Sequence, residues 1–192
     1  MKRLLFISAL LFIFISSNCF ARQPERGYRG FLEWSSSVRS EEIASWDYGS
    51  LRDTFFFTGA STSHGYQINS KFFAGAGLGM EYNQKWDTWI IPLFLQGRMD
   101  MKFGVFTPYA DLRLGYNLTQ GGGVYFSPTV GYRFNWGRKM GVNIGLGLTL
   151  IDYKIEKYES SIDLDNGFYE IYYAGNYHKV KPYFSFRVGI DF

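Results

Sequence analysis

The feature of this sequence that most restricts its fold is a regular alternation of apolar and polar residues in several short segments. It is clearest in the segment 181–192, KPYFSFRVGIDF, where Ser185, Arg187 and Asp191 separate large apolar residues. Successive side chains of a β-strand point to opposite faces, so a period of two predicts a strand with one apolar and one polar face.

Similar segments recur along the chain and predict an all-β protein. Four of them are regular: 72–82, 111–118, 124–135 and 140–150. Three are less so: 28–39, 54–66 and 88–100. In these, Phe31, Ile90 and Phe94 fall on the polar side, and the pattern does not assign the faces of 54–66. Eight strands can close into a barrel, and we predict an eight-stranded antiparallel up-and-down barrel.

The connections between the predicted strands alternate in length. Those near 67–70, 102–105 and 136–139 are short, whereas those near 40–50 and 156–179 are long. Transmembrane barrels show this asymmetry, with short periplasmic turns and longer extracellular loops. The longest connection is rich in tyrosine. It is expected to form an extended hairpin that turns at Asp165-Asn166-Gly167, and a surface partner that binds through 155–179 is the alternative role.

Alternation alone leaves open which face points outward. A soluble barrel of the lipocalin type would place its apolar side chains inside, around a ligand. Three observations favour the inverted arrangement. The polar faces are rich in glycine, which makes room inside a narrow barrel, aromatic residues gather near the strand ends, and the apolar faces of the regular strands carry no Lys or Arg, which would cost about 2 to 4 kcal/mol at the bilayer midplane.

The N-terminus has the pattern of a secretory signal peptide. Lys2 and Arg3 precede an apolar run, and small and polar residues lead to Ala21. We assign 1–21 to the signal peptide, 22–27 to a periplasmic tail and 28–192 to the barrel domain. Cleavage after Ala21 would remove Cys19, the only cysteine, and lipid modification of Cys19 is the alternative.

The last strand resembles the C-terminal assembly signal of bacterial outer-membrane barrels, because its apolar residues alternate and it ends in phenylalanine. The residues that carry this likeness are Phe184, Phe186, Val188, Ile190 and Phe192. Together with the segments above, it makes residues 28–192 similar to the small eight-stranded outer-membrane β-barrel proteins of Gram-negative bacteria, of the broad OmpX and OmpW kind. The resemblance implies an outer-membrane location, contact with outer-membrane lipid and lipopolysaccharide, and recognition by the barrel assembly machinery.

The polar faces would bring charges of both signs into the lumen, where unpaired charges are costly. The expected network consists of Glu33, Glu81, Arg98, Asp100, Asp111, Arg113, Arg133, Arg187 and Asp191. We expect these residues to pair and to plug the lumen, which suggests a structural or envelope-interaction role. A narrow porin or transporter of small hydrophobic solutes is the alternative, and a lipid A-modifying enzyme is a second one.

Other chemistry finds little support in the sequence. The catalytic candidates are Ser63, His64 and His178, but Ser63 and His64 are neighbours and so should face opposite sides of a strand. We therefore expect no catalytic site, and also no cofactor and no metal. The formal net charge of +3 comes with scattered basic residues, which argues against a nucleic-acid partner.

Overall fold

The computed structural model describes residues 26–46, 49–85, 87–101, 104–119, 122–136, 140–162 and 169–192. The predicted signal peptide and the Asp165-Asn166-Gly167 turn lie outside these ranges. No helix in the described ranges is long and apolar enough to cross a membrane.

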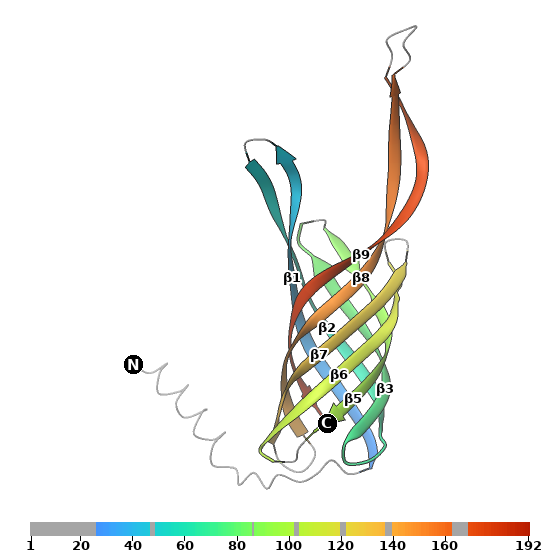
Figure 1. The fold of residues 1–192 in the computed structure, drawn as a ribbon. Coiled ribbons are helices and arrows are strands. Elements are labelled where there is room, and N and C mark those ends of the chain that lie inside the picture. The colour runs from blue at the N-terminus through green and yellow to red at the C-terminus, as the bar shows by residue number, and fades with distance from the viewer. Residues whose placement is uncertain are drawn as a thin grey trace, which may run out of the picture.

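Nine β-strands form one sheet that closes on itself (Figure 1). The strands are β1 (Gly27–Trp46), β2 (Gly49–Gln67), β3 (Phe72–Asn83), β4 (Thr88–Ile90), β5 (Pro92–Asp100), β6 (Phe106–Asn117), β7 (Gly123–Trp136), β8 (Met140–Ile162) and β9 (Tyr169–Asp191). Because β4 and β5 both pair with β3 and are separated only by Ile91, they make one wall position. The predicted eight-stranded antiparallel barrel is therefore confirmed.

The first and last strands close the wall. β1 pairs with β9 from Phe31 opposite Asp191 to Val38 opposite Phe184, and Gly30 and Phe192 exchange two backbone hydrogen bonds of 2.8 and 3.0 Å. All other neighbours in the wall are antiparallel and consecutive along the chain. No strand of the barrel is thus left with an open edge at this seam.

Side-chain burial follows the alternation of the sequence. In β5, Leu93, Leu95 and Gly97 are exposed while Phe94 and Gln96 are buried. The strand β2, whose faces the pattern left open, turns Phe55, Phe57, Ser61, Ser63 and Gln67 inward. Its outward residues include Phe56, His64 and Tyr66.

Phe31, Ile90 and Phe94 do not break the strands in which they lie. Each is no more than 2 % exposed and points into the lumen, in phase with its neighbours. The alternation between inner and outer faces is therefore intact. These three residues differ from the expected pattern only because parts of the barrel interior are apolar.

Two long ribbons extend beyond the barrel at the end opposite the short turns (Figure 1). One is formed by β1 and β2, which pair as far as Trp46 opposite Gly49. Most of the long connection predicted near 40–50 is therefore a continuation of the two paired strands. A ribbon surrounded by water has no buried face to enforce alternation, so the strand pattern fades although the pairing continues.

The other ribbon is formed by β8 and β9. They pair as far as Ile162 opposite Tyr169, with a bulge between Lys157 and Tyr158. This agrees with the extended hairpin expected for 156–179.

Candidate functional site

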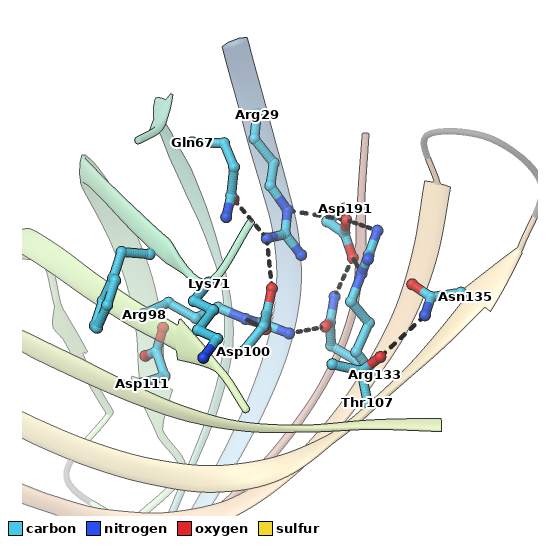
Figure 2. A network of polar contacts seen from close by, with 12 residues as sticks. Arg29, Gln67, Lys71, Arg98, Asp100, Thr107, Asp111, Arg133, Asn135 and Asp191 are labelled. Atoms are coloured by element: carbon cyan, nitrogen blue, oxygen red, sulfur yellow. Dashed lines mark hydrogen bonds and ion pairs between the residues drawn. The ribbon is translucent and has the colours of Figure 1, made fainter. Parts of the chain in front are cut away.

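The lumen contains most of the buried polar side chains and is the candidate site. One group of charges lies near the short turns, and we call it the turn-side cluster: Arg29, Arg98, Asp100, Arg133 and Asp191. These residues come from β1, β5, β7 and β9, and Figure 2 shows them converging from different parts of the wall. All five are at most 5 % exposed.

Asp191 is the centre of the turn-side cluster. Arg133 donates to both of its carboxylate oxygens, at 2.9 and 2.6 Å. Arg29 donates from Nε at 3.1 Å and Asn143 from Nδ2 at 2.9 Å. Four charge-assisted hydrogen bonds thus hold one fully buried carboxylate.

Asp100 links Arg98 to this centre through Arg29. It accepts from Arg29 Nη1 at 3.0 Å and from Arg98 Nε at 3.0 Å. Arg29 Nη1 also donates to Gln67 Oε1 at 2.8 Å, and Arg98 Nη2 donates to Asn143 Oδ1 at 2.6 Å. The cluster is therefore one continuous network across the lumen (Figure 2).

Aromatic rings fill the space between these guanidinium groups. Phe31 lies 4.7 Å from the guanidinium carbon of Arg29 and 5.1 Å from that of Arg98. Arg98 also stacks 3.6 Å above the ring of Tyr109. A buried cation above an aromatic face gains about 2 kcal/mol or more, which explains why an apolar residue sits inside the charged layer.

A second group of charges lies in the middle of the barrel, and we call it the mid-lumen cluster: Glu33, Glu81, Asp111, Arg113 and Arg187. Arg113 forms ion pairs with Glu33 and with Asp111, the latter at 3.3 Å. Arg187 also contacts Asp111 at 3.3 Å. Glu81 accepts a hydrogen bond of 2.9 Å from Ser35.

Neutral polar side chains extend the mid-lumen cluster to the neighbouring strands. Ser63 donates to Gln96, which in turn donates to Asp111. Arg113 donates to Ser61 at 3.1 Å. Taken together, the two clusters oppose five arginines to five carboxylates, so their formal charges cancel.

At the end of the lumen away from the short turns, apolar side chains gather beside buried polar ones such as Asn83 and Asn117, and we call the apolar group the outer aromatic cluster. It comprises Phe55, Phe57, Ile90, Phe94, Tyr125, Ile151 and Tyr183. Phe57 and Tyr183 meet edge to face with ring centres 4.9 Å apart. Two amines flank Phe55, with Lys85 at 4.9 Å and Lys181 at 5.7 Å from its ring centre. The interior is thus layered, with the arginine–carboxylate clusters toward the turns and in the middle, and with most of the buried rings toward the ribbons.

Inward-facing glycines leave room for these large side chains. A Cβ on Gly131 would contact the Ile144 carbonyl oxygen and would lie 2.8 Å from the Tyr109 hydroxyl. A Cβ on Gly189 would collide with Glu33. These two glycines are therefore matched to bulky residues directly opposite them on the neighbouring strands, Tyr109 and Glu33.

The wall contains a proline where its hydrogen-bond ladder would otherwise continue. The β7–β8 register passes from Phe126 opposite Leu150 to Thr129 opposite Gly147, so Pro128 falls opposite Leu148. Proline has no N–H to donate. The Ser127 hydroxyl donates to the Leu148 carbonyl instead, at 3.1 Å.

All nine charged residues that the sequence suggested for the lumen lie there, divided between the two clusters. The sequence reasoning omitted Arg29, although its alternation with Glu33 places both on one face of β1. It also missed the outer aromatic cluster. Of the suggested assembly-signal residues, Phe184, Phe186, Val188 and Ile190 lie on the outer face of β9, and the exposed Phe192 follows directly after the end of the strand.

The catalytic candidates do not come together. Ser63 is buried in the lumen, whereas His64 faces outward, where Tyr28 Oη lies 2.6 Å from its Nδ1. His178 lies in the β8–β9 ribbon, opposite Lys154. Among the described residues, no three His, Cys, Asp or Glu side chains form a group suited to a metal ion.

Comparison with known proteins gives distant likenesses in fold only. No protein-family model matches the chain, and no curated protein matches it. The outer membrane protein OprG from Pseudomonas aeruginosa is similar over 88% of this chain and 97% of its own, with 13% identity and a TM-score of 0.48. The KdgM porin covers 86% and 98%, with 12% identity and a TM-score of 0.29. Both TM-scores lie below 0.5, so neither likeness indicates what this chain does.

The polarity of the barrel itself indicates its surroundings. Leu95, Val130 and Ile144 are each more than half exposed on the outer face, while arginines and carboxylates fill the inside. Exposed rings lie near both ends of the wall, such as Tyr132 toward the turns and Trp89 toward the ribbons. An apolar band with aromatic borders around a polar interior is the arrangement of membrane-spanning barrels. The molecule is a small eight-stranded β-barrel of the bacterial outer-membrane type.

Proposed function

We propose that this protein is a non-conducting outer-membrane anchor that holds two β-ribbons at the cell surface for contacts with other molecules. The observation that carries the proposal is the filled interior. Arg113 and Tyr183 are at most 1 % exposed although both project into the lumen. An eight-stranded barrel has an interior that side chains just fill.

The pairing of the interior charges supports closure to ions. An ion that entered would have to displace a guanidinium from its carboxylate, and breaking a buried pair costs about 3 to 5 kcal/mol. It would then have to pass the outer aromatic cluster, and apolar constrictions oppose ions by excluding water. Two unlike barriers in series favour a closed barrel over a porin.

The β8–β9 ribbon supports the surface role. β8 leaves its ladder with β7 at Ile151 opposite Tyr125 and continues to Ile162. At ~3.3 Å per residue, the part from Asp152 to Ile162 is roughly 35 Å long. Short turns in such barrels face the periplasm, so this ribbon would extend outward, where a partner can reach it.

Planar-bilayer recordings test the closed lumen. We expect the purified protein to give no steady conductance steps. The double variant Glu33→Ser with Arg113→Ser removes a facing pair without changing the lumen charge, and it serves as a control for an opened interior. Regular steps from the unaltered protein would overturn the closed-barrel proposal in favour of a narrow porin.

Shortening the β8–β9 ribbon tests the surface role. Joining Ile151 to Lys181, which lie opposite each other, through an Asn-Gly turn should leave the barrel folded. A second variant shortens the other ribbon by joining Ser40 to Thr54, an opposed pair of β1 and β2. We expect the first variant to abolish adherence of expressing cells to lipopolysaccharide-coated surfaces. Unchanged adherence in both variants would contradict the surface role and leave a purely structural barrel.

A further inference from the structure

The outer wall of the barrel is hollowed on one side. The hollow has a volume of about 670 Å³ and crosses β3, β5, β6, β7 and β8. A second hollow of about 420 Å³ lies beside it toward the short turns and shares Val130 and Leu146 with it. The two hollows adjoin at these two residues on the outer face of the wall, and we call them together the groove.

Small outward residues make the floor of this groove. Ala110 and Pro108 follow each other on the outer face of β6, while Gly97 and Pro128 lie on the neighbouring strands at the height of Leu112, whose larger side chain stands between them. A Cβ added at Gly97 would have no atom within 4 Å. Small residues therefore make the outer surface of the wall recessed here, and this recess is open to the outside.

Larger apolar side chains make the sides. Register places Phe72, Met99, Ala110, Val130 and Leu146 in one row across five strands. Within this row, Phe72 and Met99 stand on one side of Ala110, and Val130 and Leu146 stand on the other. The exposed lining is thus apolar and continuous with the lipid-facing band around it.

We propose that this groove holds one acyl chain of a phospholipid from the periplasmic leaflet. The groove begins next to the short turns, since Phe72 follows the β2–β3 turn and Pro108 lies near the start of β6, and it reaches as far as Leu112 and Leu148. Its turn-side end faces the inner leaflet. If the groove were empty, the atoms that line it would lose their dispersion contacts. A flexible acyl chain can fill a narrow groove, whereas the convex surface of a second barrel would leave it empty.

Specific packing provides the affinity. Lipid tails are as apolar as leucine, so there is little hydrophobic gain on moving a tail from the bilayer to the groove. What the groove adds is close contact with fixed side chains on three sides. Each of the two hollows, at about 670 and 420 Å³, falls in the range of about 300 to 1,000 Å³ that is usual for ligand sites.

Native mass spectrometry of the full chain tests the proposal. The barrel is released from nanodiscs of phosphatidylethanolamine and phosphatidylglycerol, and we expect one retained phospholipid. Ala110→Leu and Gly97→Leu raise the floor and should lower the lipid-bound fraction several-fold. Ala60→Leu is the matched control, because Ala60 is exposed on the outer face between Trp34 and Met80 and lies away from the groove; it should leave the fraction unchanged.

Each contrary result has a definite meaning. Equal lipid retention by the Ala110→Leu variant and the unaltered barrel would overturn the proposal, as would equal loss in the Ala60→Leu control. A lipid-free dimer that Ala110→Leu abolishes would also overturn it and would identify a second copy as the occupant. Heat-modifiable migration on gels confirms that every variant is folded, so loss of lipid cannot be mistaken for loss of the barrel.

Discussion

Ser127 uses every hydrogen-bonding capacity of its hydroxyl group at the Pro128 break. It donates to the Leu148 carbonyl at 3.1 Å, accepts from Arg187, and lies 2.8 Å from the Thr149 hydroxyl. Since the one hydroxyl proton goes to Leu148, Thr149 must donate to Ser127. One small residue thus joins the wall to the charged interior.

Replacing Ser127 should therefore lower the stability of the barrel markedly only while Pro128 is present. We expect Ser127→Ala to lower the free energy of unfolding by about 1 to 3 kcal/mol, because the Leu148 carbonyl loses its donor. In a Pro128→Ala background a backbone N–H becomes available to that carbonyl, so the same change should cost less. Urea titrations in lipid vesicles measure the double-mutant cycle. Equal costs in both backgrounds would show that Ser127 does not compensate for the proline.

Asp191 gives the second prediction at this scale. Asp191→Ala leaves Arg29 and Arg133 without their shared carboxylate, and we expect a loss of about 3 to 5 kcal/mol in unfolding free energy. Asp53→Asn is the control, since Asp53 pairs with Lys85 where both side chains are partly exposed. It should cost about 1 kcal/mol or less. Similar urea midpoints for the two variants would contradict the central role of Asp191.

At the scale of the strand, the sequence determined most of the fold because hydrocarbon on one side and a filled interior on the other enforce a period of two. The tail strand illustrates this, with Arg187 buried and Phe186 exposed as expected. Where no such contrast exists, the pattern failed. The β1–β2 ribbon extends beyond the barrel, and the alternation did not predict that β1 continues to Trp46 or that β2 begins at Gly49.

The sequence predicted which types of residue line the candidate site, but it did not predict how these residues are arranged in layers along the barrel. Periodicity assigned Arg98 and Asp111 to the inner face, but their partners depend on which strands meet at one height. That height is set by the stagger of all eight wall positions, which no single strand encodes. Ile90 and Phe94 therefore looked misplaced, although they belong to the outer aromatic cluster.

Two glycines, one on the inner and one on the outer face of the wall, allow the assignment of these faces to be tested. Gly131 faces inward, where a Cβ would contact the Ile144 carbonyl, and Gly131→Ala should destabilise the barrel by about 1 to 3 kcal/mol through overpacking. Gly97 faces outward with free space, and Gly97→Ala should stabilise it by roughly 0.5 to 1 kcal/mol. Urea titrations of both variants give the comparison, and effects of the same sign would refute the assignment of faces.

At the scale of the whole molecule, opposite charges are balanced where solvent ions cannot reach them. The side chains that pair in the turn-side cluster are at most 6 % exposed. Salt screens exposed charges over about 3 Å at 1 M, but it screens buried pairs much less. The electrostatic stability of the barrel should therefore be largely insensitive to ionic strength.

Urea midpoints at low salt and at about 1 M salt measure this directly. We expect them to agree closely for the unaltered barrel. Asp191→Asn, which leaves excess positive charge inside, should unfold more easily at both salt concentrations. A large fall in the midpoint of the unaltered protein with salt would mean that the interior pairs are open to solvent.

The pairing of β1 with β9 has a consequence for how freely the polypeptide can be rearranged. The wall is a ring in space, and Phe31 lies directly opposite Asp191, so a short linker between these strands would complete a covalent circle. Such a circle could be cut at any of the connections between strands without removing a rung of the ladder. Circular permutants of this barrel should thus share one final architecture and differ only in which hairpin is synthesised last.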